Sequence, residues 1–181
     1  PAYQYDQRKA TLFGAELRFD IHPHPLDWLH IENTFSYVHA RFAEALDGSR
    51  NIPYIPAARL LSELRADLME KGRVIRNLSL SVEMDATFAQ RAAFTGYETE
   101  TATPGYTLLN TGVSADILSK GRTLMRVYLH ALNIGDVAYQ SHLSRLKYTD
   151  ENLLTGRRGV FAMGRNFSIK VNVPLSWDLK K

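Results

Sequence analysis

The chain has no cysteine among its 181 residues. A disulfide framework, a catalytic thiolate and a thiolate metal site are therefore excluded. It also has no uncharged apolar run of about eighteen residues, the length that a transmembrane helix needs. Its 22 Lys and Arg residues nearly balance its 19 Asp and Glu residues and form no basic run. We therefore expect no nucleic-acid partner.

The composition that remains suits two classes of protein. A hydrophobic fraction of 45% with 23% charged residues is ordinary for a soluble domain. It is equally ordinary for a membrane-spanning β-barrel, because only alternate residues of each strand touch lipid. The chain begins at Pro1 with neither a methionine nor an export signal, so we interpret it as a fragment or a processed product.

The dominant pattern is an alternation of apolar and polar residues. Residues 78–88 show it most clearly, with leucine, valine, methionine and phenylalanine on one face and serine, glutamate, aspartate and threonine on the other. The pattern predicts an all-β, antiparallel fold with about seven strands, at 15–22, 29–41, 58–71, 78–88, 106–117, 123–134 and 167–175, where the last apolar face continues to Trp177.

The segment 58–71 has two interpretations. Leu60, Leu61, Leu64 and Leu68 fit one stripe of an amphipathic helix, and the residues around them are good helix formers. The same segment also alternates, with Glu63, Arg65 and Asp67 on its polar side. Because strands are predicted on both sides of it, we predict a strand here.

The predicted connections alternate in length. Those near Pro23, Gly72 and Gly121 are short, whereas those around Asp47, Gly96 and Thr149 are long. Outer-membrane barrels have short periplasmic turns and long extracellular loops, and their aromatic residues form girdles near the strand ends. The aromatic residues near the predicted strand ends are Trp28, Tyr37, Phe94, Tyr106 and Tyr139.

Several stretches together resemble the end of a TonB-dependent outer-membrane receptor of the Bacteroidetes type. NIGDVAYQSHLSRLK at 133–147 is similar to the family's NLFD-x-AY-x-x-HLSRLK segment, and GRNFSIKVNVPL at 164–175 is similar to its closing strand. Weaker similarities are GAELRFDI from Gly14, IPYIPAARL from Ile52 and GYTLLNTGVS from Gly105. Two departures are Ile134 and Gly135 in place of Leu-Phe, and a chain that continues past Trp177 to Lys181.

The resemblance implies a location and a function. Family members have a barrel of about twenty-two strands with a plug in its lumen. Residues 1–181 would then be the carboxy-terminal part of that antiparallel transmembrane β-barrel, without the plug and the earlier strands. The implied function is active import of a metal complex, a siderophore or a similar nutrient. Implied partners are outer-membrane lipid and lipopolysaccharide, the missing plug and strands, and the TonB system through the absent amino-terminal region.

Cationic residues of the last long loop are the candidate contacts for a ligand. They could bind an anionic metal chelate or a lipopolysaccharide phosphate, or simply keep the loop solvated. These candidates are His142, Arg145, Lys147, Arg157 and Arg158.

No enzyme, cofactor or metal site is expected. His22 and His24 could form a metal pair, but they lie at a predicted turn, where exposed histidines are commoner than ligands. Four carboxylates are better explained as lumen-facing groups that pair with arginines such as Arg65 and Arg126; they belong to Glu63, Asp67, Glu83 and Asp85. No serine lies in a nucleophile-elbow motif.

Two other functions fit the alternation. One is a stand-alone small outer-membrane barrel that acts as an adhesin or a structural anchor. The other is a soluble β-barrel that binds a small ligand. Detergent dependence of solubility separates the soluble barrel from the membrane proteins, and the length of the intact gene product separates a receptor from a small barrel.

Overall fold

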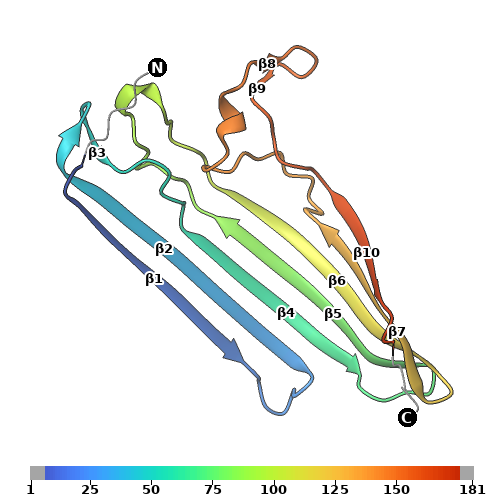
Figure 1. The fold of residues 1–181 in the computed structure, drawn as a ribbon. Coiled ribbons are helices and arrows are strands. Elements are labelled where there is room, and N and C mark those ends of the chain that lie inside the picture. The colour runs from blue at the N-terminus through green and yellow to red at the C-terminus, as the bar shows by residue number, and fades with distance from the viewer. Residues whose placement is uncertain (1–6, 176–181) are drawn as a thin grey trace, which may run out of the picture.

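The computed structural model describes residues 7–175, which fold into one curved antiparallel sheet (Figure 1). Its path follows the order of the strands in the chain: β1 (Ala10–Ile21), β2 (Leu29–Leu46), β4 (Arg59–Met69), β5 (Ile75–Thr87), β6 (Tyr106–Ser119), β7 (Arg122–Leu132) and β10 (Asn166–Asn172). The short β3 (Ser49–Asn51) pairs with the end of β2. The all-β antiparallel prediction is confirmed. Within residues 7–175 the sheet does not close, because β1 and β10 are its two edges.

The remaining elements are short and lie in the connections. β8 (Glu151–Asn152) and β9 (Arg157–Arg158) form a separate hairpin. Two 3₁₀ turns are η1 (Gly96–Glu98) and η2 (Arg145–Tyr148). None of the helices in the described part of the chain is long and apolar enough to cross a membrane.

All seven predicted strands are present, and the ambiguous segment 58–71 is strand β4. It pairs with β2 on one side and β5 on the other, and Leu64 lies opposite both Ile31 and Val82. Two ladders of hydrogen bonds and these cross-strand contacts outweigh a helical propensity of a few tenths of a kcal/mol per residue. Trp177 lies outside the described residues.

The predicted asymmetry of the connections is also confirmed (Figure 1). One end of the sheet carries the short turns 22–28, 70–74 and 120–121, and the other end carries the long loops 47–58, 88–105 and 133–165. The tightest turn at this short-turn end is Lys120-Gly121, where φ is 50° and 78°. Two positive φ values in a two-residue hairpin turn match the twist of the strands that it joins.

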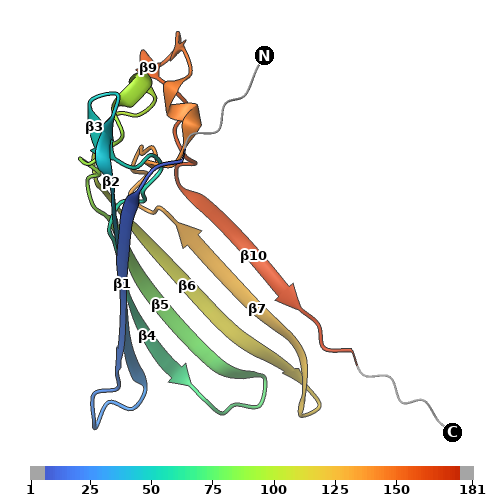
Figure 2. The ribbon, with the colours of Figure 1, turned by 60° about the vertical axis from the view of Figure 1, so that its left-hand side comes forward.

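The apolar face of the sheet is uncovered. Leu80, Val113, Leu129 and Ile169 lie opposite one another across four strands and remain 36% to 73% exposed. Seen from another side, the strands form a single layer with no second layer packed against it (Figure 2). Within residues 7–175 only five apolar residues are buried, and two of them, Ala93 and Phe94, lie in a long loop and not in the sheet. A soluble protein rarely leaves so much apolar surface open.

The aromatic residues near the predicted strand ends lie in different places: on the apolar face, in a short turn, and at or within the long loops. Trp28 and Tyr37 are exposed, and Tyr37 lies beside Phe13, with ring centroids 6.2 Å apart. Phe94 is only 4% exposed within the loops, and Tyr106 packs on Tyr139 with centroids 4.2 Å apart on the polar face. The prediction that Phe94, Tyr106 and Tyr139 form an outward girdle is therefore wrong, because these three rings fill the space beneath the loops.

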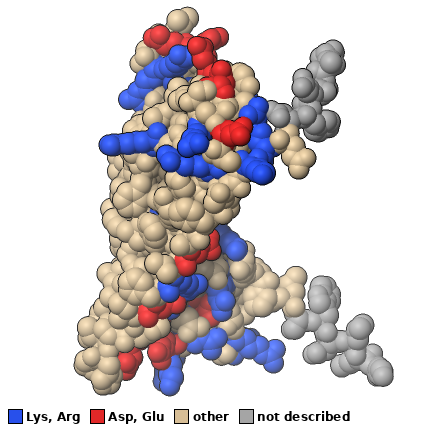
Figure 3. Space-filling view, turned by 90° about the vertical axis from the view of Figure 1, so that its left-hand side faces the viewer, with Lys and Arg blue, Asp and Glu red and all other residues tan. Residues whose placement is uncertain are grey.

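Charged side chains are unevenly distributed. In the side view of Figure 3, Lys, Arg, Asp and Glu residues gather in two zones, one over the loop end and one toward the turn end. A band of other residues separates these zones. Within the sheet, most of the charges belong to the face opposite Leu80 and Val113, which we call the polar face; Arg41, toward the loop end of β2, is an exception.

Candidate functional site

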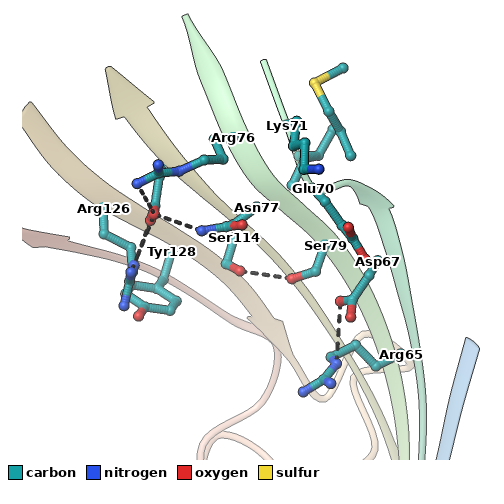
Figure 4. A pocket seen from close by; sticks show the side chains of 13 residues that line it. Arg65, Asp67, Glu70, Lys71, Arg76, Asn77, Ser79, Ser114, Arg126 and Tyr128 are labelled. Carbon is teal, nitrogen blue, oxygen red and sulfur yellow. Dashed lines mark hydrogen bonds and ion pairs between the residues drawn. The ribbon is translucent and has the colours of Figure 1, made fainter. Parts of the chain in front are cut away.

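The most buried charged group of the polar face is Asp116 of β6, which is 1% exposed. Its partners Arg76, Asn77 and Arg126 lie close together beside one cavity (Figure 4). Arg126 donates to its carboxylate from Nε at 2.5 Å and from Nη2 at 3.2 Å. Asn77 donates at 2.9 Å, and Arg76 lies 3.8 Å away. The bulge between Arg76 and Ser79, with φ of 53° at Asn77, turns the Asn77 amide toward β6. Three strands are thereby joined beside a cavity of about 750 Å³.

Other carboxylates of the polar face also pair with cations. Arg59 donates to Asp85 from Nε at 2.8 Å and from Nη2 at 2.6 Å. Asp67 lies 2.9 Å from Nε2 of His30 and 3.5 Å from Nε of Arg65. The predicted pairing of Asp67 with Arg65 is therefore confirmed.

Two predicted pairings differ in their partners. The partner of Asp85 is Arg59, and Arg126 binds Asp116, which the sequence did not single out. Register decides both pairings. Asp116 lies directly opposite Arg126, whereas Asp85 lies directly opposite Leu61 and is reached diagonally by Arg59, two residues earlier on β4. Alternation shows which face a side chain is on but gives no register.

An acidic row crosses four strands of the polar face, where Asp20, Glu32, Glu63 and Glu83 lie opposite one another. Directly opposed like charges are destabilising. Arg18 reduces the repulsion by binding Glu32 at 3.0 Å, and Asn110 does so by binding Glu83 at 2.7 Å. Such a row is tolerable only where water or countercharges reach it.

The described residues contain no group of three His, Cys, Asp or Glu side chains placed to hold a metal ion. His24 lies in the predicted turn with its side chain 86% exposed, 3.5 Å from Asp27. His22 packs its ring edge against His30, with centroids 4.7 Å apart. A metal pair at His22 and His24, the alternative to exposed turn histidines, would therefore have no third ligand within residues 7–175.

At the loop end, four buried polar side chains form a cluster that we call the loop clasp: Glu100, Thr103, His142 and Lys147. All four are less than 10% exposed. Lys147 donates from Nζ to Thr103 Oγ1 at 2.8 Å and to the carbonyl of His142 at 3.0 Å. Glu100 accepts the N–H groups of Tyr54 and Phe94 at 2.7 and 3.0 Å. The clasp therefore ties all three long loops together.

The five candidate ligand contacts do not form one site. Arg145, Arg157 and Arg158 are exposed, with Arg145 over the ring of Tyr54 and Arg157 over that of Phe161. His142 and Lys147 are 5% and 8% exposed, so a ligand cannot reach them while the loops stay packed. Contact with an anion stays a prediction for the three arginines. No pattern in the sequence could have revealed the clasp partners Glu100 and Thr103, about 40 residues upstream.

No protein-family model matches this chain. No curated protein matches it either. The resemblance to TonB-dependent receptors therefore stays a prediction, and the function has to be argued from the two faces of the sheet and from the loops.

The electrostatic setting of the clasp favours a neutral His142. Burial lowers the pKa of its imidazole, and the nearby Lys147 ammonium lowers it further, whereas Glu100 opposes both. Its Nδ1 lies 2.9 Å from Thr103 Oγ1 and 3.4 Å from Lys147 Nζ. Its Nε2 is buried without a hydrogen bond, 3.8 Å from Glu100.

A matched pair of glycines tests how tightly the clasp is packed. Gly159 and Gly156 both have positive φ, 78° and 63°, so alanine costs backbone strain of about 1–2 kcal/mol at either. Only at Gly159 would the added Cβ also meet the backbone of Lys147; at Gly156 the nearest atom is 3.8 Å away. We expect Gly159→Ala to speed amide hydrogen exchange throughout 133–165, and Gly156→Ala to affect only the hairpin. Equal effects would contradict tight packing.

Proposed function

We propose that this chain forms part of the wall of an outer-membrane active transporter that imports a metal complex or a similar nutrient. The observation that carries the proposal is a single-layered sheet, within residues 7–175, with an uncovered apolar face and a charged opposite face. In hydrocarbon the apolar face is satisfied, and the charged face then lines a lumen. A soluble sandwich would bury its apolar face against a second sheet instead.

The dimensions of the sheet support a membrane location. Most strands of the sheet have at least 11 residues, and β2 has 18. About 9–11 residues of a tilted strand cross a bilayer, so the strands are long enough to span it and extend beyond it. Short turns at one end and long packed loops at the other match the periplasmic and extracellular sides.

The edges of the sheet support a barrel with more strands. β1 and β10 each have one side unpaired within residues 7–175. Unpaired backbone N–H and C=O groups cannot be satisfied in hydrocarbon, so further strands must pair with both edges. The resemblance to TonB-dependent receptors implies that these strands belong to one larger barrel, with a plug in its lumen and the TonB system as the energy source. The transport function is also inferred from this resemblance, and no catalytic role is proposed.

Outer-membrane fractions of cells that express the full-length protein test the membrane part of the proposal. We expect the protein in that fraction, soluble only in detergent, and folded in a form that migrates differently on gels before and after heating. Purification as a soluble protein without detergent would favour a soluble ligand-binding barrel.

Deletion of the gene in its host tests the transport part. We expect loss of energy-dependent uptake of the chelated nutrient, restored by the wild-type gene. A protein that is embedded in the outer membrane but dispensable for every uptake process tested would favour the adhesin or anchor alternative.

A further inference from the structure

We propose that the loop clasp is an acid-sensitive latch, in which a proton added to His142 releases the three long loops from one another. This goes beyond the proposed function, because the latch needs only the loop packing described above. The four side chains are buried, and Thr103, His142 and Lys147 share hydrogen bonds. All four side chains are less than 10% exposed, so little solvent contact is left to stabilise an added charge.

The hydrogen bonds fix where the imidazole carries its proton. Lys147 donates to the hydroxyl oxygen of Thr103, so the hydroxyl hydrogen is available to Nδ1 of His142. The Lys147 ammonium also lies 3.4 Å from Nδ1. Because two donors face Nδ1, this nitrogen is the acceptor, and the proton of the neutral ring is on Nε2. A second proton on Nδ1 would require the Thr103 hydroxyl hydrogen to turn away from that nitrogen, and it would place an N–H group 3.4 Å from the Lys147 ammonium.

The charges of the clasp oppose that second proton. Glu100 and Lys147 cancel each other while His142 is neutral, so an imidazolium leaves the buried cluster with one net positive charge. Glu100 cannot offset this fully, since its carboxylate already accepts two backbone N–H groups and lies 3.8 Å from Nε2. A buried charge without a matched partner is strongly unfavourable.

The strands beneath the clasp do not supply a counterion. Arg59 and Asp85 line the same cavity of about 420 Å³ as His142, but they neutralise each other. The other groups nearest to the clasp are tyrosines: Tyr106 and Tyr139 line that cavity, and the Lys147 ammonium lies 4.9 Å from the centre of the Tyr148 ring.

The direction of the pH effect follows from the lowered pKa of His142 in the folded loops. Above the ordinary pKa of 6.5 the imidazole is neutral in both open and packed loops, and the clasp has its full stability. As the pH falls below that value, His142 binds a proton in the open loops but stays neutral in the packed loops. The clasp therefore loosens with acidification until the pH falls below the pKa of the packed state.

Thiol labelling of the full-length protein in its native membrane tests the latch. Ala93→Cys places a probe at a buried site in the loops, 3% exposed, and Leu153→Cys places a reference on the hairpin tip, 96% exposed. The rate ratio of the two sites, measured by mass spectrometry of the maleimide-labelled peptides, cancels the pH dependence of the reagent. We expect this ratio to rise between about pH 7.5 and 5, by about tenfold for each unit of pKa depression.

Two histidine variants give the controls. In His142→Gln the amide oxygen still accepts from Thr103 but does not titrate, so the ratio should stay flat with pH. In His24→Gln, which alters an exposed turn histidine, it should rise as in the wild type. A pH-dependent ratio that persists in His142→Gln would overturn the proposal.

Two charge variants keep the test decisive if His142→Gln fails to fold. Lys147→Met removes the repulsion and so reduces the pKa depression of His142, and the rise of the ratio between pH 7.5 and 5 should be smaller than in the wild type. Glu100→Gln removes the attraction and so increases the depression, and the rise should be larger. Changes of the rise in the same direction, or no change in either variant, would exclude His142 as the group that titrates.

Discussion

Val113→Arg is expected to prevent assembly of the protein in the outer membrane. Val113 lies in the middle of β6 on the apolar face, in a row with Leu80 and Leu129. If that face meets hydrocarbon, an arginine near the midplane costs about 2–4 kcal/mol. Such a loss is a large part of the 5–15 kcal/mol that stabilises a typical fold. The measurement is the amount of heat-modifiable, folded protein in the outer-membrane fraction.

Ser114→Arg is the matched control, one residue further along the same strand. Ser114 lies on the polar face, where its hydroxyl is 2.8 Å from that of Ser79 beside the cavity at Asp116. The new cation would join Arg65, Arg76 and Arg126, which line the same cavity on the polar face. We expect assembly close to that of the wild type. If Ser114→Arg assembled worse than Val113→Arg, the two faces would have to be exchanged and the membrane proposal would fail.

The strands were predictable because each obeys a local regularity. Alternation with a period of two needs only neighbouring residues, and the turn at Lys120-Gly121 and the prolines after β1 mark where strands end. Even β4, with four leucines at helical spacing, followed from the strands around it. The end of β2 was missed by five residues, since it extends to Leu46 through pairing with β3 and not through its own pattern.

The site was less predictable because its contacts are distant in sequence. Asn33 interrupts the apolar alternation of β2, and its partner is the Ser62 hydroxyl on β4, 2.8 Å from Oδ1. His142 and Lys147 resembled solvated loop cations, and only the folded loops reveal that they are buried with Glu100. Sequence position therefore gave residue type and face, whereas burial and pairing required the register and the loop packing.

Asp116→Ala is expected to destabilise the sheet by about 2 kcal/mol. Removal of one partner from a buried ion pair costs about 3–5 kcal/mol, and the cost is lower here because the Arg126 side chain is about half exposed. The substitution leaves Arg126 and Arg76 without their shared carboxylate, and the Asn77 amide at the bulge loses its acceptor. The measurement is the denaturant midpoint of the protein refolded into lipid vesicles, with the slope of the transition checked for change.

Asp20→Ala provides the comparison because it makes the same substitution on the same face. Asp20 is about one-third exposed, and its partner Arg18 is 63% exposed and also binds Glu32. An exposed pair contributes about 0–1 kcal/mol, and removal of one carboxylate from the acidic row relieves repulsion with Glu32. Asp20→Ala should therefore leave the midpoint nearly unchanged. Equal losses in the two variants would mean that register and backbone pairing, and not the buried Asp116 network, hold β5, β6 and β7 together.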